Sequence, residues 1–168
     1  MICTKLLVPT LAAGVTLALV PLNPRAPAAG PGAVIAMHER LFRALDSGDS
    51  ALARSFATAH ENSIGQADCI LYLPTEDGKL ARHAGADAAG AALAACAEAS
   101  ARAGGSFETK ITFARDDCQS ADASYAILEF ERSHTAGGKT TVRQFRSTSL
   151  VRYVDGAWKL FHWNVAPR

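Results

Sequence analysis

The chain of 168 residues carries 17 Lys and Arg against 16 Asp and Glu, a formal net charge of +1, and 49% of its residues are hydrophobic. This balance lacks the basic excess that marks a nucleic-acid-binding surface, and it offers no electrostatic attraction to an anionic membrane. The length suits one domain with a single hydrophobic core. We therefore expect a one-domain protein without a nucleic-acid partner.

The first 28 residues contain the three regions of a secretory signal peptide in the usual order. Residues 1–5 carry one positive charge, residues 6–20 are almost wholly apolar, and Ala26-Pro27-Ala28 has the small-x-small pattern of a cleavage site. Cleavage after Ala28 would leave residues 29–33 as a flexible lead-in and no stable membrane association. The alternative is an uncleaved anchor, although the apolar run is shorter than the roughly 20 residues that span a bilayer. The alanine- and arginine-rich composition is typical of a high-GC bacterial protein, so we expect a periplasmic or secreted product.

Three cysteines follow the leader, at Cys69, Cys96 and Cys118. An oxidising compartment permits one disulfide and one remaining thiol, and the sequence leaves all three pairings open. The chain contains no Cys-x-x-Cys, and its histidines are too scattered for two of them to ligate one metal ion. We expect one structural disulfide, no metal site and no cofactor.

Two helices and a pair of short strands are predicted in the first half of the mature chain. Apolar residues recur at helical spacing over residues 34–45, and Ser47-Gly48 ends this helix. A second helix is expected from residue 50 to about residue 60. Residues 69–73 form an apolar run typical of a strand, and residues 80–83 are predicted to pair with it.

The second half combines one helix with four strands. Residues 86–103 are mostly alanine, which favours a helix. Asp155-Gly156 is typical of a two-residue type I′ hairpin turn, because both central residues of that turn need φ > 0. The order α-α-β-β-α-β-β-β-β predicts the α+β class, with helices on one face of a curved antiparallel sheet. The four predicted strands span residues 107–114, 123–132, 140–153 and 158–165.

Several short strings resemble the nuclear transport factor 2-like superfamily, and its SnoaL-like branch in particular. They are residues 45–49 between the first two helices, Leu71–Pro74 in the first strand, Gly85 before the third helix, and residues 154–162 in the final hairpin. Together they cover residues 34–166, within a domain expected to span 34–168. The resemblance implies a cone, in which the sheet wraps over the N-terminal helices and encloses a pocket. The final hairpin is also similar to the association domain of calcium/calmodulin-dependent kinases, a non-enzymatic member that oligomerises.

The resemblance also implies which reaction is absent. Ketosteroid isomerases of this superfamily use a proton-shuttling Asp, an oxyanion-donating Tyr and a protonated Asp, and the matching positions here hold Leu73, Leu41 and Ser149. Moving a proton beside a carbonyl needs a base and an oxyanion donor, and leucine is neither. We therefore do not expect isomerase chemistry by the family's route.

His162 is the candidate polar anchor of the implied pocket. It alternates with Asn164 along the last strand, and the two-residue turn would place these side chains opposite Ser149 and Ser147. Two alternatives remain: His162 is a hydrogen-bonded core residue, or a bulge in the last strand turns Trp163 inward instead. We expect a small apolar molecule to contact seven ligand-binding residues, namely Leu41, Leu73, Ser149, Val151, Leu160, His162 and Asn164.

These features favour an exported small-molecule-binding domain over two alternatives. The first is a dehydratase-, cyclase- or isomerase-type enzyme with His162 as its acid or base. The second, which is compatible with either, is an oligomerising domain. Leu150, Phe161 and Trp163 are candidates for the outward face of the last hairpin, and an exposed apolar patch marks an interface. We expect a homodimer through this face.

Overall fold

The first helix, α1 (Ala33–Ser47), is amphipathic, as its spacing predicts. Gly48 ends it with φ 79° and donates its N–H to the carbonyl of Ala44. A Cβ at Gly48 would lie 2.7 Å from the Cβ of Ala101 on the third helix. Only glycine permits both the left-handed turn and this close approach. The buried face of α1 consists of Val34, Met37, His38, Leu41, Phe42, Ala44 and Leu45.

The second helix, α2 (Ser50–Arg54), is shorter than predicted. Asp49 caps it by accepting a hydrogen bond from the Leu52 N–H at 2.9 Å. The expectation that it continues to about residue 60 was wrong, because the chain after it joins the sheet. The N–H of Leu160 donates to the Phe56 carbonyl at 2.7 Å, and the N–H of Thr58 donates to the Leu160 carbonyl at 2.9 Å. These backbone groups cannot also continue a helix.

The computed structural model describes residues 32–168 apart from 59, 62–66, 76–77, 119 and 121. The predicted signal peptide and its cleavage site lie outside the described residues. No helix among the described residues is long and apolar enough to cross a bilayer.

Six strands form the main sheet, in the order β4-β3-β8-β7-β6-β5. β3 and β8 run parallel, and all other neighbours run antiparallel. Asp155 and Gly156 both have positive φ, 51° and 80°, which confirms the predicted hairpin. A separate two-stranded sheet, β1 (His60–Glu61) with β2 (Ala67–Asp68), was not predicted. The six strands are β3 (Ile70–Pro74), β4 (Leu80–Ala84), β5 (Ser106–Cys118), β6 (Ala123–Ala136), β7 (Lys139–Val154) and β8 (Ala157–Pro167).

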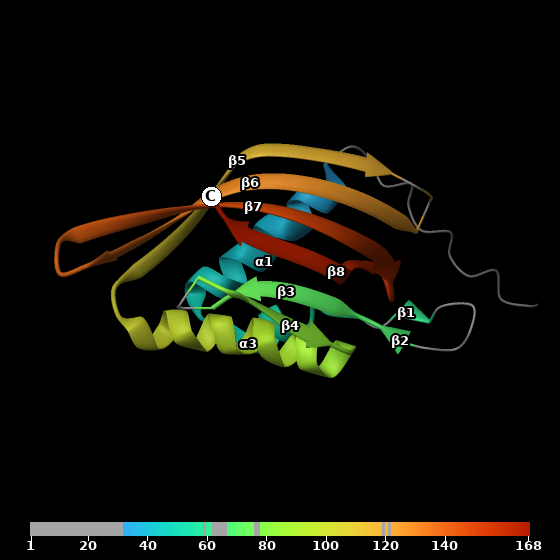
Figure 1. Cartoon of the computed structure of the whole chain (residues 1–168), viewed down its shortest axis with the longest axis horizontal. Coiled ribbons are helices and arrows are strands. Elements are labelled where there is room, and N and C mark those ends of the chain that lie inside the picture. The colour runs from blue at the N-terminus through green and yellow to red at the C-terminus, as the bar shows by residue number, and fades with distance from the viewer. Residues whose placement is uncertain (1–31, 59, 62–66, 76–77, 119, 121) are drawn as a thin grey trace, which may run out of the picture.

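The sheet curves over the helices, which confirms the α+β class and the cone shape (Figure 1). α1 lies against the sheet, and α3 (Ala86–Ala103) packs on α1, on α2 and beneath the β3–β4 pair. Arg132 on β6 links the C-terminal ends of two helices to the sheet. Its Nε donates to Asp46 Oδ1 of α1 at 3.0 Å, and a terminal nitrogen donates to Ser100 Oγ of α3 at 2.7 Å. Thr109 on β5 adds a hydrogen bond of 2.9 Å to the same carboxylate. The core therefore lies between the helices and one face of the sheet.

The predicted disulfide does not form. Cys69 and Cys96 are both free thiols, and each of the three predicted pairings needs at least one of them. Cys69 is fully buried, with its Sγ 3.8 Å from the Leu160 carbonyl, whereas Cys96 is on α3. Burial raises the pKa of both thiols, so they are small core side chains rather than reactive groups.

Candidate functional site

A β-bulge in β8 decides which side chains face the helices. Leu150 pairs with His162, whereas the next residue of β7, Val151, pairs with Leu160, so Phe161 is an extra residue in β8. An extra residue reverses the alternation of side chains beyond it. Four side chains of β8 are buried on the helix side, two before the bulge and two after it: Trp158, Leu160, Trp163 and Val165.

The predicted position of His162 was wrong for this reason. His162 lies opposite Leu150 and Asn164 lies opposite Thr148, rather than opposite the two predicted serines. Both side chains are therefore on the outer face of the sheet, away from the helices. The centroid of the His162 ring is 6.1 Å from that of Tyr72 on β3, and partial burial there lowers the pKa of His162. The alternative register, with the tryptophan turned inward, is the one that forms.

The other predicted ligand-binding residues do come together. They belong to α1, β3, β7 and β8, and all of them are buried on the helix side of the sheet. They therefore belong to the packed region between α1 and the inner face of the sheet, which we call the interior of the cone. These five residues are Leu41, Leu73, Ser149, Val151 and Leu160.

His38, which the sequence analysis left aside, is a titratable residue of this interior. Its side chain is fully buried on α1, and its Nδ1 lies 2.9 Å from the carbonyl oxygen of Val34. Because a carbonyl only accepts hydrogen bonds, Nδ1 carries the proton and Nε2 presents a lone pair. Desolvation lowers the pKa of His38 to about 4, so the ring is neutral at pH 7. The sequence could have identified His38 as an interior residue by its spacing. It lies four residues after Val34 and three before Leu41, which places it on the apolar face of α1.

Trp163 approaches His38 from the sheet. The two ring centroids are 6.2 Å apart, and Trp163 lies directly opposite Ser149 in the β7–β8 pairing. Six buried side-chain polar atoms in the described part of the chain have no hydrogen-bond partner, and Arg152 Nε and Asn164 Oδ1 are two of them. The other four are on the inner side of the sheet or on α1, namely His38 Nε2, Trp163 Nε1 and the hydroxyls of Ser147 and Ser149. We call these four residues the interior polar cluster. Leaving a buried polar atom unpaired costs about 1–3 kcal/mol. A ligand whose polar atoms pair with the cluster would remove this cost.

The cluster offers both kinds of hydrogen-bonding group. The indole N–H of Trp163 only donates, Nε2 of His38 only accepts in this tautomer, and the two serine hydroxyls can do either. A carbonyl oxygen could accept from Trp163, and a hydroxyl could donate to His38. No group of three or more His, Cys, Asp or Glu residues among the described residues is arranged to hold a metal ion.

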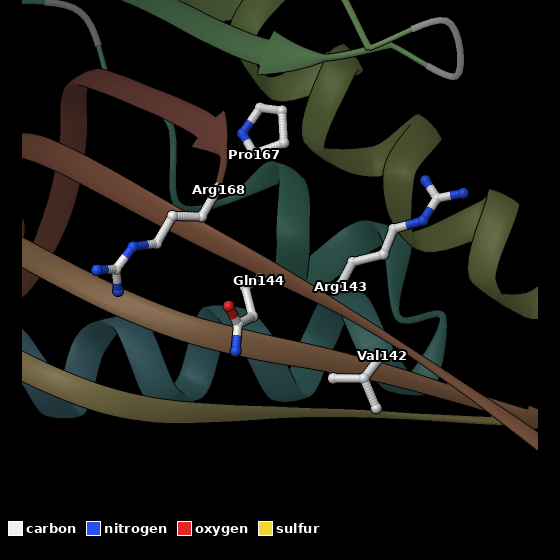
Figure 2. A pocket seen from close by; sticks show the side chains of 5 residues that line it. All are labelled: Val142, Arg143, Gln144, Pro167 and Arg168. Atoms are coloured by element: carbon white, nitrogen blue, oxygen red, sulfur yellow. The ribbon is translucent and has the colours of Figure 1, made fainter.

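Two surface hollows lie outside the cone interior. One, of about 390 Å³, is at the end of β8 and is lined by Val142, Arg143, Gln144, Pro167 and Arg168 (Figure 2). The other, of about 340 Å³, is a groove between α1 and β5. Phe42 lines this groove and also contacts the cluster, with its ring centroid 6.4 Å from that of His38 and 6.2 Å from that of Trp163. Phe42 therefore separates the groove from the cone interior. The groove is lined by Glu39, Phe42, Arg43, Thr109, Lys110 and Ile111.

Comparison with known proteins gives a likeness in structure alone. No protein-family model matches the chain, and no curated protein matches it in sequence. A proposed dehydratase of the nuclear transport factor 2-like family from Streptomyces avermitilis superposes with a TM-score of 0.63 at 15% identity, covering 81% of this chain and 94% of that one. A proposed scytalone dehydratase from Novosphingobium aromaticivorans gives 0.61 at 14% identity, with coverages of 81% and 82%.

A third similar structure has a different role. It is a proposed calcium/calmodulin-dependent protein kinase II association domain from Xanthomonas campestris, with a TM-score of 0.61, 14% identity, and coverages of 80% and 85%. At such identities the likeness establishes the fold but not the activity. Both the element order and the superpositions agree with the resemblance found in the sequence, and the chain has the nuclear transport factor 2-like fold.

Proposed function

We propose that the protein binds a small molecule inside the cone and that the interior polar cluster holds the polar group of that molecule. The observation that carries this proposal is the set of four buried, unpaired polar atoms contributed by α1, β7 and β8. Such groups are rare in folded proteins unless something pairs with them. A few convergent polar groups within apolar walls are the usual form of a small-molecule site.

The walls of the cluster favour a ligand with a flat apolar body. Phe42 and Phe130 lie with ring centroids 4.6 Å apart, and Trp163 lies 6.2 Å from Phe42. Aromatic side chains pack well against planar ligands. The proposed ligand therefore carries one hydroxyl or carbonyl oxygen on an apolar, preferably aromatic, body.

The groove between α1 and β5 is the proposed entrance. Phe42 is the side chain that the groove and the interior share, so rotation of its ring would connect them. Charged side chains at the rim of the groove, Glu39, Arg43 and Lys110, keep the entrance hydrated while the interior stays apolar.

NMR of the indole N–H groups tests binding directly, with p-cresol and toluene as probes that differ only in a hydroxyl. We expect p-cresol to shift the Trp163 indole resonance, to leave the Trp158 resonance nearly unchanged, and to bind about tenfold more tightly than toluene. His38→Leu should remove that difference. Equal affinity for the two probes, or shifts confined to Trp158, would count against the proposal.

Catalysis is the second candidate function, and the free lone pair of His38 is the observation that favours it. Any acid–base step inside the cone would use His38, because His162 lies on the outer face of the sheet. A base with a pKa near 4 is weak at neutral pH, and for this reason we place binding first. A turnover that survives His38→Leu would contradict a catalytic role of this residue.

The outer face of the sheet supports a proposed homodimer. Tyr125, Leu150, His162 and Ile70 lie side by side on four neighbouring strands, and each is only partly buried. A continuous row of mostly apolar side chains suits a self-complementary two-fold interface. Trp163, a candidate for this face in the sequence analysis, is instead on the inner side.

Export remains part of the proposal, and the leader sequence supports it. N-terminal sequencing of protein from the periplasmic or extracellular fraction should give Ala29 as the first residue. Intact Met1 in a membrane pellet would instead indicate an anchored protein.

A further inference from the structure

The hairpin of β6 and β7 extends past the last described residues of β8, so that one edge of β7 has no partner strand among the described residues. Pairing between β7 and β8 ends at Phe145 and Pro167, and the N–H of Arg168 adds a last hydrogen bond of 2.9 Å to the Gln144 carbonyl. From residue 143 to residue 139, β7 pairs with β6 alone. In Figure 1 this hairpin projects beyond the labelled C-terminus. We call residues 139–143 of β7 the open edge.

The open edge presents backbone groups for another strand. Since the Gln144 carbonyl faces β8, the alternation of an antiparallel ladder directs the N–H and C=O groups of Val142 and Thr140 to the same side. All five residues of the open edge are exposed, and Val142 is 56% exposed. An exposed row of such groups is a template for pairing with another strand.

A hollow lies where the next strand residues would lie. Its volume is about 390 Å³, and it runs from the last residues of β8 onto the open edge. Figure 2 shows Pro167 and Arg168 at one end of the hollow and Val142 at the other. A strand that continues the line of β8 would fill it.

The charges of the open edge are all basic. Lys139 and Arg143 lie on the same side of β7, and neither has an ion pair among the described residues. Arg143 is directly opposite Arg132, whose charge Asp46 already neutralises at 3.0 Å. Like charges opposite each other destabilise a sheet, whereas opposite charges across strands stabilise it. The edge is therefore complementary to an acidic strand.

A second copy of this chain fits the edge less well. Antiparallel pairing of two open edges about Thr141 would place Lys139 of each copy opposite Arg143 of the other. We propose that the open edge of β7 binds an extended acidic peptide segment, which joins the sheet as an added strand beyond β8. Backbone hydrogen bonds supply the affinity in this mode, and side chains at alternate positions supply the selectivity. Acidic residues four apart would face Arg143 and Lys139.

Fluorescence anisotropy with labelled peptides tests the proposal. The probe is the peptide Ser-Glu-Val-Thr-Thr-Glu-Ser, and its control has Gln in place of both Glu residues. We expect the acidic peptide to bind about fivefold more tightly than the control, with an affinity that falls as salt is added. Equal binding of the two peptides, or no binding of either at millimolar concentration, would overturn the proposal.

Three variants locate the site. Val142→Pro removes an edge-facing N–H and should weaken the acidic peptide about tenfold. Arg143→Gln should remove the preference for acid. Arg146→Gln is the matched control, because it removes an exposed arginine from the same strand where β8 covers the edge, opposite Ala166. We expect it to bind like the wild type, and an equal loss in Arg146→Gln would overturn the assignment.

The indole resonances of Val142→Pro must first show that this variant folds. A charge-reversal variant provides a test that does not depend on it. Arg143→Glu should reverse the preference towards a peptide with Lys in place of Glu. Failure of this reversal overturns the proposal, as does self-association through the edge, seen by light scattering and lost in Val142→Pro, without any binding of the acidic peptide.

Discussion

The two sides of the main sheet carry similar side chains but differ in what covers them. On the inner side, Trp163 and Ser149 lie under α1 and complete a polar cluster with His38. On the outer side, His162 and Leu150 occupy the neighbouring positions, and none of the described helices covers them. A histidine is present on each side, yet only the inner one is fully buried. The bulge at Phe161 produces this division, so one extra residue decides which residues of β8 belong to the interior.

The largest expected effect compares two adjacent residues. Trp163→Ala should lower the free energy of unfolding by about 3–5 kcal/mol, the usual cost of removing a large buried aromatic side chain. His162→Ala, one residue earlier and on the outer side, should cost about 0.5 kcal/mol or less in the monomer. Urea denaturation measures both. Similar losses in the two variants would contradict the register of β8 given by the bulge.

The pH dependence of stability sharpens the same comparison. Burial lowers the pKa of His38 from 6.5 to about 4, so the unfolded chain takes up a proton before the folded one does. Protonation of His38 should leave the free energy of unfolding unchanged well above pH 6.5. As the pH falls from 6.5 to 4, this free energy should decrease by about 3 kcal/mol in total. Thermal or urea unfolding across this range measures it.

His38→Leu is the control for this dependence. It should flatten the stability profile between pH 6.5 and pH 4 to a greater extent than His162→Leu, because His162 is only partly buried. A profile that changes more in His162→Leu would show that the outer histidine is the one shielded from water.

A smaller effect on stability, but a clear one on assembly, is expected for the outer side. Leu150→Glu adds a charge to the apolar row and should convert a dimer to a monomer, with about 0.5 kcal/mol or less of change in monomer stability. Val142→Glu makes the same change on the same strand, away from that row, and should leave the dimer intact. Light scattering at tens of micromolar distinguishes the outcomes, and a wild-type monomer would contradict the proposed interface.

Local signals predicted most of the fold. The spacing of Val34, Leu41 and Leu45 defined α1, the alanine-rich run defined α3, and Asp155-Gly156 defined the last hairpin. The end of α2 was not predictable in this way, because Phe56 is held by Leu160, far along the chain. Local patterns record propensity, and a long-range contact can override it.

The candidate site was predicted only in part, and the bulge is the reason. The run from Trp158 to Val165 fits two registers, and they exchange His162 and Trp163 between the faces. Burying the larger apolar ring on the inner side favours the observed register, but this preference becomes visible only once α1 is placed over the sheet. His38 was recognisable by spacing alone, whereas its approach to Trp163 depends on tertiary packing.

The most direct test of the interior site is the ¹⁵N resonance of His38 Nε2 during a titration with p-cresol. The neutral, Nδ1-protonated ring seen here predicts an unprotonated Nε2 in the free protein at pH 7. Its resonance should move upfield as the phenol hydroxyl donates to it, and toluene should leave it unchanged. A protonated Nε2 in the free protein, or a resonance that p-cresol does not move, would contradict ligand binding by the interior polar cluster.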